Sequence, residues 1–255
     1  MLPKSSARQR KQGVFIASIA LASVLGTLLL GNLRFFQLVH LKASDLQFVV
    51  RGKLPTKNIV LLVADQKTQE RFPELMLFWH PYYATAIQAA AEGGAKVMAL
   101  DVTFPVPVDK WAPDNDRMLS EAVLNTADRM PVICSFVPAM MAKQREWPVP
   151  LNLTSAMLGQ AALANLTTDP DDFMRSQELL EQPGTGEAAG APNRGLALRL
   201  GEKFRGVDAT FENGKLQWAG STIPISPSRT IFINFAGPPG TFPSISLSDF
   251  IEAAR

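Results

Sequence analysis

Residues 59–65 read Ile-Val-Leu-Leu-Val-Ala-Asp, six apolar residues followed by a carboxylate. A nearly continuous apolar run of this length is typical of a strand that is buried on both faces of a sheet. We therefore expect a central strand here, and the residues around it indicate what covers the sheet.

The residues that follow this run alternate between helix and strand signals. Tyr82 to Glu92 is rich in alanine and is followed by Gly93-Gly94, which predicts a helix with a glycine C-cap. Lys96 to Phe104 then predicts a second strand. Strand, helix and strand in this order form a βαβ unit, in which the strands are parallel and the crossover is right-handed.

The same order recurs further along the chain. Asp114 and Asn115 are suited to cap a helix that runs to about Thr126, and Met130 to Phe136 predicts a third apolar strand. The sequence therefore predicts an α/β fold with an open, mainly parallel sheet flanked by helices.

The second half of the chain predicts shorter elements, including an antiparallel portion. Asn213-Gly214 lies between two alternating arms, which is a strong signal for a type I′ hairpin. Glu181 to Asn193 has low complexity and predicts a surface loop. The other expected elements are strands at Gln160 to Leu166, Ser221 to Ile225 and Thr230 to Phe235, and helices at Arg194 to Phe204 and Leu247 to Ala254, the last capped by Ser246 or Ser248.

An uncharged apolar run, Val14 to Leu30, lies near the N-terminus and follows four basic residues: Lys4, Arg8, Arg10 and Lys11. As a helix, the run covers about 25 Å, and the next few residues extend it toward the thickness of a hydrocarbon core. Basic residues before the run predict that the N-terminus stays inside and that the rest is exported. The run is longer than the apolar region of a cleaved signal peptide, so we favour an anchor over that alternative.

These signals divide the chain into a cytoplasmic basic tail (1–12), a transmembrane helix (13–33) and an extracytoplasmic domain (34–255). Leu33 to Val50 is amphipathic, and it fits an interfacial or juxtamembrane helix and a core helix equally well. The chain ends at Arg255 within a predicted helix, so we expect an N-terminal fragment of a longer membrane protein with its main domain in the periplasm or outside the cell.

Composition excludes several classes of function. A formal net charge of +2, without a basic stripe beyond the N-terminus, argues against nucleic acid as a partner. Cys134 is the one cysteine, so there is no internal disulfide, and its apolar surroundings favour a buried thiol. The two histidines, His40 and His80, do not provide a zinc site or a serine triad, and the sequence predicts no metal and no cofactor.

Four residues are candidates for contact with a ligand. Asp65 and Asp101 stand at or near the carboxyl ends of the first two predicted strands, where open α/β sheets bind ligands. Trp79 and Tyr83 belong to an aromatic cluster beside those ends. The alternatives are that the aspartates cap neighbouring amides and that the aromatic residues form core, and we do not expect a catalytic residue among them.

The order of several short motifs resembles the second type of the CHASE domain, an extracellular sensory module associated with cyclases and histidine kinases. The motifs that carry the resemblance, over about Leu41 to Arg255, are Asp45, Arg51-Gly52, Ile59 to Asp65 with Lys67-Thr68, Tyr83, Gly94-Ala95, Asp101-Val-Thr-Phe104, Ala164-Asn165, Asp169 to Arg175, Leu196-Ala-Leu198, Ile231 to Gly237, Thr241-Phe-Pro243 and Ser246-Leu-Ser-Asp249. A tryptophan-proline-arginine stretch of that family stands here as Phe78-Trp79-His80-Pro81.

The resemblance implies a bacterial sensory input domain that follows one span and precedes further spans and an output module, such as a nucleotide cyclase, a serine/threonine kinase or a histidine kinase. It implies an unidentified small-molecule or envelope ligand, and small residues in the span favour a homodimer. The alternatives are a membrane-anchored hydrolase or metal-dependent enzyme that uses Asp65 and Asp101, and a structural envelope protein.

Overall fold

The computed structural model describes residues 7–31, 33–136, 150–164, 166–181 and 194–254. They form two compact units. Unit one contains Met1–Pro55 and Phe235–Pro238, and unit two contains Thr56–Asn234 and Pro239–Arg255. Most of the loop predicted at Glu181 to Asn193 lies outside the described residues.

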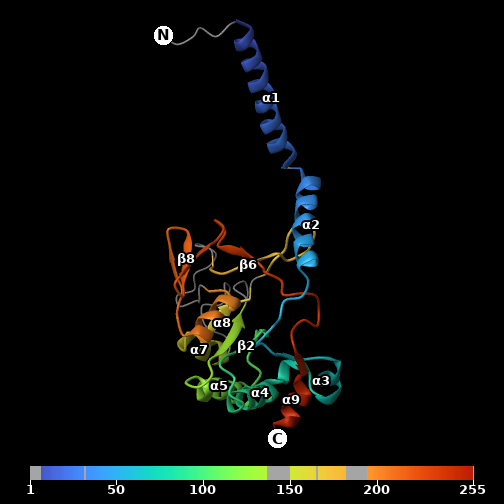
Figure 1. Cartoon of the computed structure of the whole chain (residues 1–255). Coiled ribbons are helices and arrows are strands. Elements are labelled where there is room, and N and C mark those ends of the chain that lie inside the picture. The colour runs from blue at the N-terminus through green and yellow to red at the C-terminus, as the bar shows by residue number, and fades with distance from the viewer. Residues whose placement is uncertain (1–6, 32, 137–149, 165, 182–193, 255) are drawn as a thin grey trace. The chain divides into compact units, whose positions relative to one another are not determined.

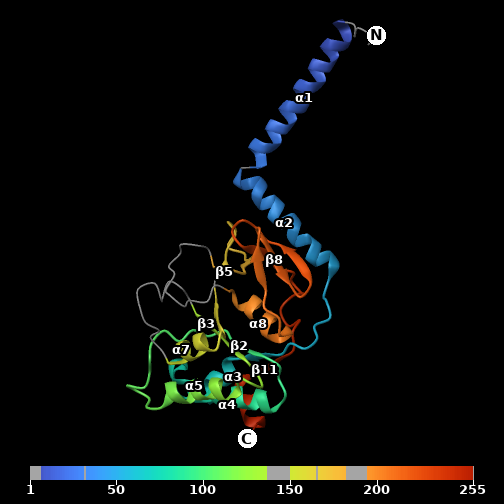
Figure 2. The same cartoon turned by 90° about the vertical axis from the view of Figure 1, so that its left-hand side faces the viewer.

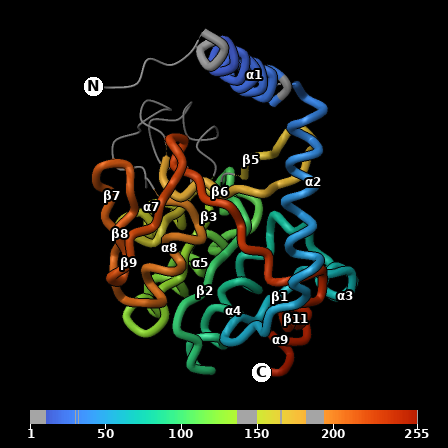
Figure 3. Tube along the Cα trace, turned by 45° about the horizontal axis from the view of Figure 1, so that its top comes forward, coloured from blue at the N-terminus to red at the C-terminus, as the bar shows by residue number. Residues whose placement is uncertain are grey.

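Unit one consists mainly of two helices, α1 (Ala7–Gly31) and α2 (Arg34–Arg51), which confirm the helices predicted at 14–30 and 33–50 (Figure 1). Within α1, Lys11–Leu29 is long and apolar enough to cross a membrane, and none of this stretch is buried. The chain bends between the two helices, so α2 does not continue the line of α1 (Figures 2 and 3).

Unit two contains a parallel sheet with the strand order β2-β3-β4, formed by β2 (Met98–Leu100), β3 (Val132–Phe136) and β4 (Ala161–Leu163). The helix α5 (Asn115–Thr126) connects β2 to β3, and α7 (Pro150–Met157) precedes β4. This part confirms the predicted parallel sheet flanked by helices. The strands are shorter than expected.

The prediction for residues 59–65 is wrong in two respects. The strand β1 (Leu61–Val63) pairs in parallel with β11 (Ser244–Ser246), near the end of the chain, and β2 lies in a different sheet. It is also not a buried central strand, because Leu61 is 45% exposed and Val63 is 38% exposed. An apolar run identifies a strand, but it does not identify which later strand will pair with it.

The remaining strands are antiparallel and form two small sheets. The first has the order β10-β6-β5, from β10 (Thr230–Phe232), β6 (Ser176–Glu178) and β5 (Leu166–Thr167), and the second has the order β7-β8-β9, from β7 (Thr210–Glu212), β8 (Lys215–Trp218) and β9 (Ser221–Pro224). Asn213 and Gly214 have φ of 51° and 72° between β7 and β8, which confirms the type I′ turn. The helix expected at 194–204 is α8 (Leu196–Arg205).

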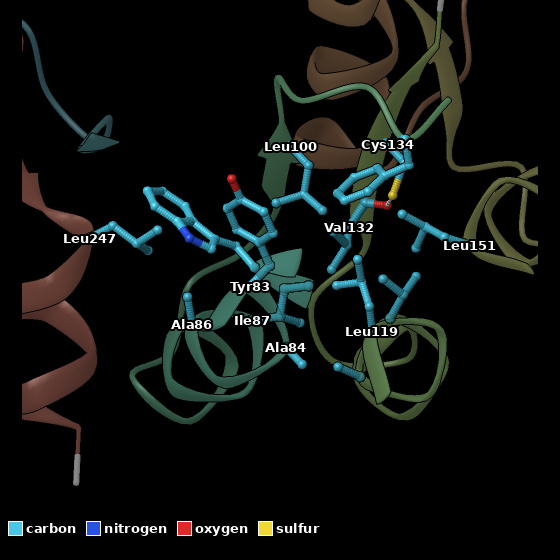
Figure 4. Close-up of a cluster of buried hydrophobic side chains, with 14 of the residues drawn as sticks. Tyr83, Ala84, Ala86, Ile87, Leu100, Leu119, Val132, Cys134, Leu151 and Leu247 are labelled. Atoms are coloured by element: carbon cyan, nitrogen blue, oxygen red, sulfur yellow. Dashed lines mark hydrogen bonds between the residues drawn. The ribbon is translucent and has the colours of Figure 1, made fainter. Parts of the chain in front are cut away.

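The main core of unit two lies between the parallel sheet and two helices, α4 (His80–Glu92) and α5. Figure 4 shows Ile87 of α4 and Leu119 of α5 packed near Val132 of β3, and each of these three side chains is fully buried. Ala84 and Ala86 are also buried, and their small side chains let the elements around α4 approach it closely. Cys134 is buried as predicted, and burial raises the pKa of its thiol to about 12.

Candidate functional site

Asp65 is the N-cap of a short helix, α3 (Gln66–Arg71). Its Oδ1 accepts hydrogen bonds from the Thr68 amide at 2.9 Å, from the Thr68 hydroxyl at 2.8 Å and from the Ser246 hydroxyl at 2.8 Å. The Thr68 amide is the main reason why the pKa of Asp65 is lowered, and the Ser246 hydroxyl adds to the effect. Asp65 therefore caps α3 and connects it to the end of β11. This agrees with the alternative that the aspartate caps a neighbouring amide instead of binding a ligand.

Asp101 follows β2 and is exposed. Because β1 and β2 belong to different sheets, the structure does not place Asp65 and Asp101 at neighbouring strand ends. Within the described ranges there is no group of three or more His, Cys, Asp or Glu side chains that is suited to hold a metal ion. A ligand contact at either aspartate stays a prediction.

Trp79 and Tyr83 lie in the core, with exposed fractions of 2% and 5%. The indole Nε1 of Trp79 donates a hydrogen bond to the Glu74 carbonyl at 2.8 Å, and the ring meets Phe72 edge to face at 5.2 Å. The ring of Tyr83 extends from α4 beside Leu100 of β2 (Figure 4). Burial raises the pKa of Tyr83 to about 12, so its hydroxyl stays protonated.

His80 is a buried polar residue that the sequence pattern does not indicate as part of a site. It begins α4 and is 1% exposed, and its Nε2 lies 3.4 Å from Oδ1 of Asp116, a fully buried carboxylate in the first turn of α5. Phe104 separates this pair from Tyr83, because its ring centroid lies 5.0 Å from that of His80 and 6.0 Å from that of Tyr83. We call His80, Tyr83, Phe104 and Asp116 the His80 cluster.

The backbone around the His80 cluster holds Asp116 in place. Oδ2 of Asp116 accepts hydrogen bonds from the amides of Val108 and Asp109, at 2.7 and 3.1 Å, and Oδ1 of Asp109 accepts one from the Asp116 amide in return. The Asn115 side chain donates to the Phe78 carbonyl at 3.1 Å, which connects the start of α5 to the residues before α4. The first turns of α4 and α5 are thus fixed side by side.

Several polar atoms of the His80 cluster lack a hydrogen-bond partner in the part of the chain that the structure describes. They are both ring nitrogens of His80, the Tyr83 hydroxyl and Oδ1 of Asp116. A buried polar atom without a partner costs about 1–3 kcal/mol, so each one calls for a physical explanation, such as a bound water, an ion or a functional role. A group that forms hydrogen bonds with these atoms would stabilise the cluster.

The charge state of His80 depends on opposing effects. Burial lowers its pKa below the ordinary 6.5, while Asp116, Asp109 and the Leu77 carbonyl act in the opposite direction and do not fully compensate. His80 is therefore neutral at neutral pH, and protonation brings a positive charge into the core beside Asp116. The cluster therefore contains a group that can take up a proton, and polar atoms that can form further hydrogen bonds.

The sequence held one signal for this site. Asp109, Asp114 and Asp116 all stand close to the start of a predicted helix, and one of them was expected as its cap. The structure has Asp114 at the N-cap position without a capping side-chain bond, and it turns Asp116 inward toward His80. The approach of α4 to α5 cannot be deduced from spacing along the chain, so the pair was missed.

A second feature lies in unit one, where the C-terminal end of α2 is attached to Phe235–Pro238. Phe48 packs edge to face on Phe235 at 5.4 Å, and the Arg51 guanidinium donates a hydrogen bond to the Phe235 carbonyl. The Leu54 amide donates to the Ala236 carbonyl at 2.7 Å. We call these five residues the clasp. It holds the end of α2 to the segment that immediately follows β10 and Asn234.

The family model of the CHASE2 domain matches residues 19–255, which is most of the chain. No curated protein and no solved structure matches it. The family is a sensory, non-catalytic domain that occurs in signalling proteins.

Proposed function

Because the chain belongs to the CHASE2 domain family, we propose that it is the extracytoplasmic stimulus-sensing input module of a transmembrane signalling protein. The output, a nucleotide cyclase, a serine/threonine kinase or a histidine kinase, is not contained in residues 1–255. The observation that carries the proposal is the His80 cluster, a buried group of polar side chains with unsatisfied atoms inside a domain of a sensory family.

The position of the membrane follows from α1. Its apolar stretch is unburied over Lys11–Leu29, and basic residues precede it, so we propose that α1 crosses the bacterial inner membrane with the N-terminus in the cytoplasm. A reporter enzyme that is active only outside the cytoplasm, fused after Arg255, tests this orientation. Activity of that fusion supports it, and activity of a cytoplasm-only reporter at the same site contradicts it.

Within the domain, the His80 cluster is the proposed stimulus site, and of the four residues suggested by the sequence it includes Tyr83. A stimulus that provides partners for His80 and Tyr83, or that protonates His80, changes the relative free energies of two packings of the first turns of α4 and α5. The clasp is the proposed route by which this conformational change reaches α2. The reason is that β10 is followed in the chain by the residues that hold the end of α2.

The small residues of α1 support a homodimer. Ala17, Ala20, Ala22, Ser23 and Gly26 permit close contact between two spans. Single cysteines placed along 17–26 in membranes test this pairing, with the natural buried Cys134 as the common background. Periodic disulfide formation supports the dimer, and uniform absence of crosslinks contradicts it.

The sensory role is tested with the proton, a stimulus that the His80 cluster itself can bind. Amide hydrogen exchange of the full chain in lipid nanodiscs is measured at about pH 7.5 and about pH 5.5. After correction for the intrinsic pH dependence of amide exchange, we expect lower protection factors at the lower pH in the first turns of α4 and α5 and in Phe235–Pro238. The His80→Gln variant should lose this response, and an unchanged response in that variant contradicts the proposed site.

A further inference from the structure

The helix α2 exposes an apolar face that nothing in the described residues covers. It has 18 residues, and none of them is buried. The side chains of this face are Phe35 (68% exposed), Phe36 (41%), Val39 (50%), Leu46 (58%), Val49 (75%) and Val50 (80%). With Ala43 between them, they recur at intervals of three and four residues and therefore form one continuous side of the helix.

The other side of α2 already contacts residues of the chain. Leu38, Leu41 and Phe48 are half-buried, and Phe48 belongs to the clasp. The exposed face therefore points away from the side that is attached to Phe235, and it is free to meet something outside the chain.

The place of α2 in the chain indicates what this face meets. Only Asn32 and Leu33 separate α2 from α1, so a span formed by α1 places the start of α2 at the level of the lipid headgroups. The aromatic pair Phe35 and Phe36, with ring centroids 5.4 Å apart, lies at this level.

The charge of α2 fits the same surface. It contains three basic residues, Arg34, Lys42 and Arg51, against one acidic residue, Asp45. The Lys42 side chain borders the apolar face and is 63% exposed. A basic border beside an apolar face is the chemistry by which helices lie on membranes that contain anionic lipids.

We propose that the exposed face of α2 is inserted into the outer surface of the membrane, between headgroups and acyl chains, with anionic headgroups beside Lys42. This inference rests on the proposed function, in which α1 spans the bilayer. Pairing of this face with α2 of a second copy of the chain is the less suitable alternative. A contact between two helices of about 15 residues buries less surface than the roughly 800 Å² per partner of a standard protein interface. The clasp attaches α2 to Phe235–Pro238, so lipid bound to α2 would be connected through α2 to this segment.

The test uses the full chain, reconstituted in vesicles of phosphatidylcholine with or without phosphatidylglycerol. Single cysteines at Val39, Leu46 or Val50 carry an environment-sensitive fluorophore, and Gln37, exposed on a different side of α2, provides the matched control. We expect severalfold stronger quenching by nitroxide-labelled acyl chains at the three face positions than at Gln37. Aqueous iodide should show the reverse order. Lys42→Gln should reduce the extra quenching that phosphatidylglycerol provides.

Each other outcome has a defined meaning. Iodide quenching at the face positions equal to that at Gln37 shows a solvated face and overturns the inference. Protection from both quenchers, or disulfides between copies at Leu46, shows that protein covers the face and overturns it as well. A label at Ala20 of α1 separates the two proposals, because loss of lipid quenching there contradicts the span itself, whereas loss only at α2 contradicts this inference alone.

Discussion

Two helices of this chain, α4 and α2, use apolar residues in opposite ways. Six of the 13 residues of α4 are buried, His80, Tyr83, Ala84, Ala86, Ile87 and Ala91, whereas α2 has 18 residues and buries none. Small alanines let α4 pack closely against its neighbouring elements, while α2 presents larger side chains to its surroundings. An apolar pattern thus specifies a helix, and only the neighbouring elements decide whether its apolar face becomes core or an external surface.

The largest effect should follow from a cavity under α4. Ile87 is fully buried in the main core, so Ile87→Ala should lower the free energy of unfolding by about 3 kcal/mol. Gln88→Ala changes an exposed neighbour on the same helix and should shift the stability by less than about 0.5 kcal/mol. Chemical denaturation in detergent measures both, and equal effects would contradict the described packing of α4.

The polar end of α4 should depend on its partner in α5. Asp116→Ala removes the acceptor of two backbone amides and the carboxylate beside His80, which should cost about 2–3 kcal/mol. The control is Asp101→Ala at an exposed carboxylate, where the stability should stay nearly constant. A similar loss in the two variants would show that the Asp116 contacts contribute no particular stability.

The same contrast explains how much of the fold the sequence predicts. Local signals were sufficient for the Asn213-Gly214 turn, for α4 and its Gly93 C-cap, and for α1 and α2, because each depends on residues close together in the chain. The pairing of β1 was not predictable in this way. Its partner β11 lies about 180 residues later, and an apolar run contains no information about so distant a strand.

For the candidate site, the sequence indicated Asp65, Asp101, Trp79 and Tyr83, and a ligand contact at these residues stays a prediction. The stretch from Phe78 to Tyr83 does contain the buried polar cluster, but Asp65 is engaged as a helix cap and Trp79 as core. His80 was set aside because His40 and His80, far apart in the sequence, do not provide a zinc site or a serine triad. Its partner Asp116 is brought to it by the packing of α5 on α4, a tertiary contact with no signature in residue spacing.

A pH effect should distinguish the histidine of α4 from that of α2. The pKa of buried His80 lies below 6.5, so the unfolded chain takes up a proton at a higher pH than the folded protein does. Stability is then complete above about pH 6.5 and falls as the pH is lowered through this value, by at most about 1.4 kcal/mol per pH unit. Asp65, whose pKa is lowered from 3.8, contributes to acid sensitivity only in a more acidic range.

Thermal unfolding between about pH 7.5 and about pH 5 measures this dependence. His80→Gln should remove most of it, whereas His40→Gln, at the exposed histidine of α2, should leave it unchanged. If the pH dependence persists in His80→Gln, other groups cause it. That result would contradict the proposal that His80 of α4 is the stimulus site.

The smallest effect on stability should come from the exposed face of α2. Leu46→Ser and Val50→Ser remove large apolar groups that are 58% and 80% exposed, so the free energy of unfolding in detergent should change by less than about 0.5 kcal/mol. Core residues of the same size are sensitive because their removal leaves a cavity, and an uncovered face has none to leave. A loss comparable with that of Ile87→Ala would mean that protein covers this face, and the distinction between α2 and α4 would then disappear.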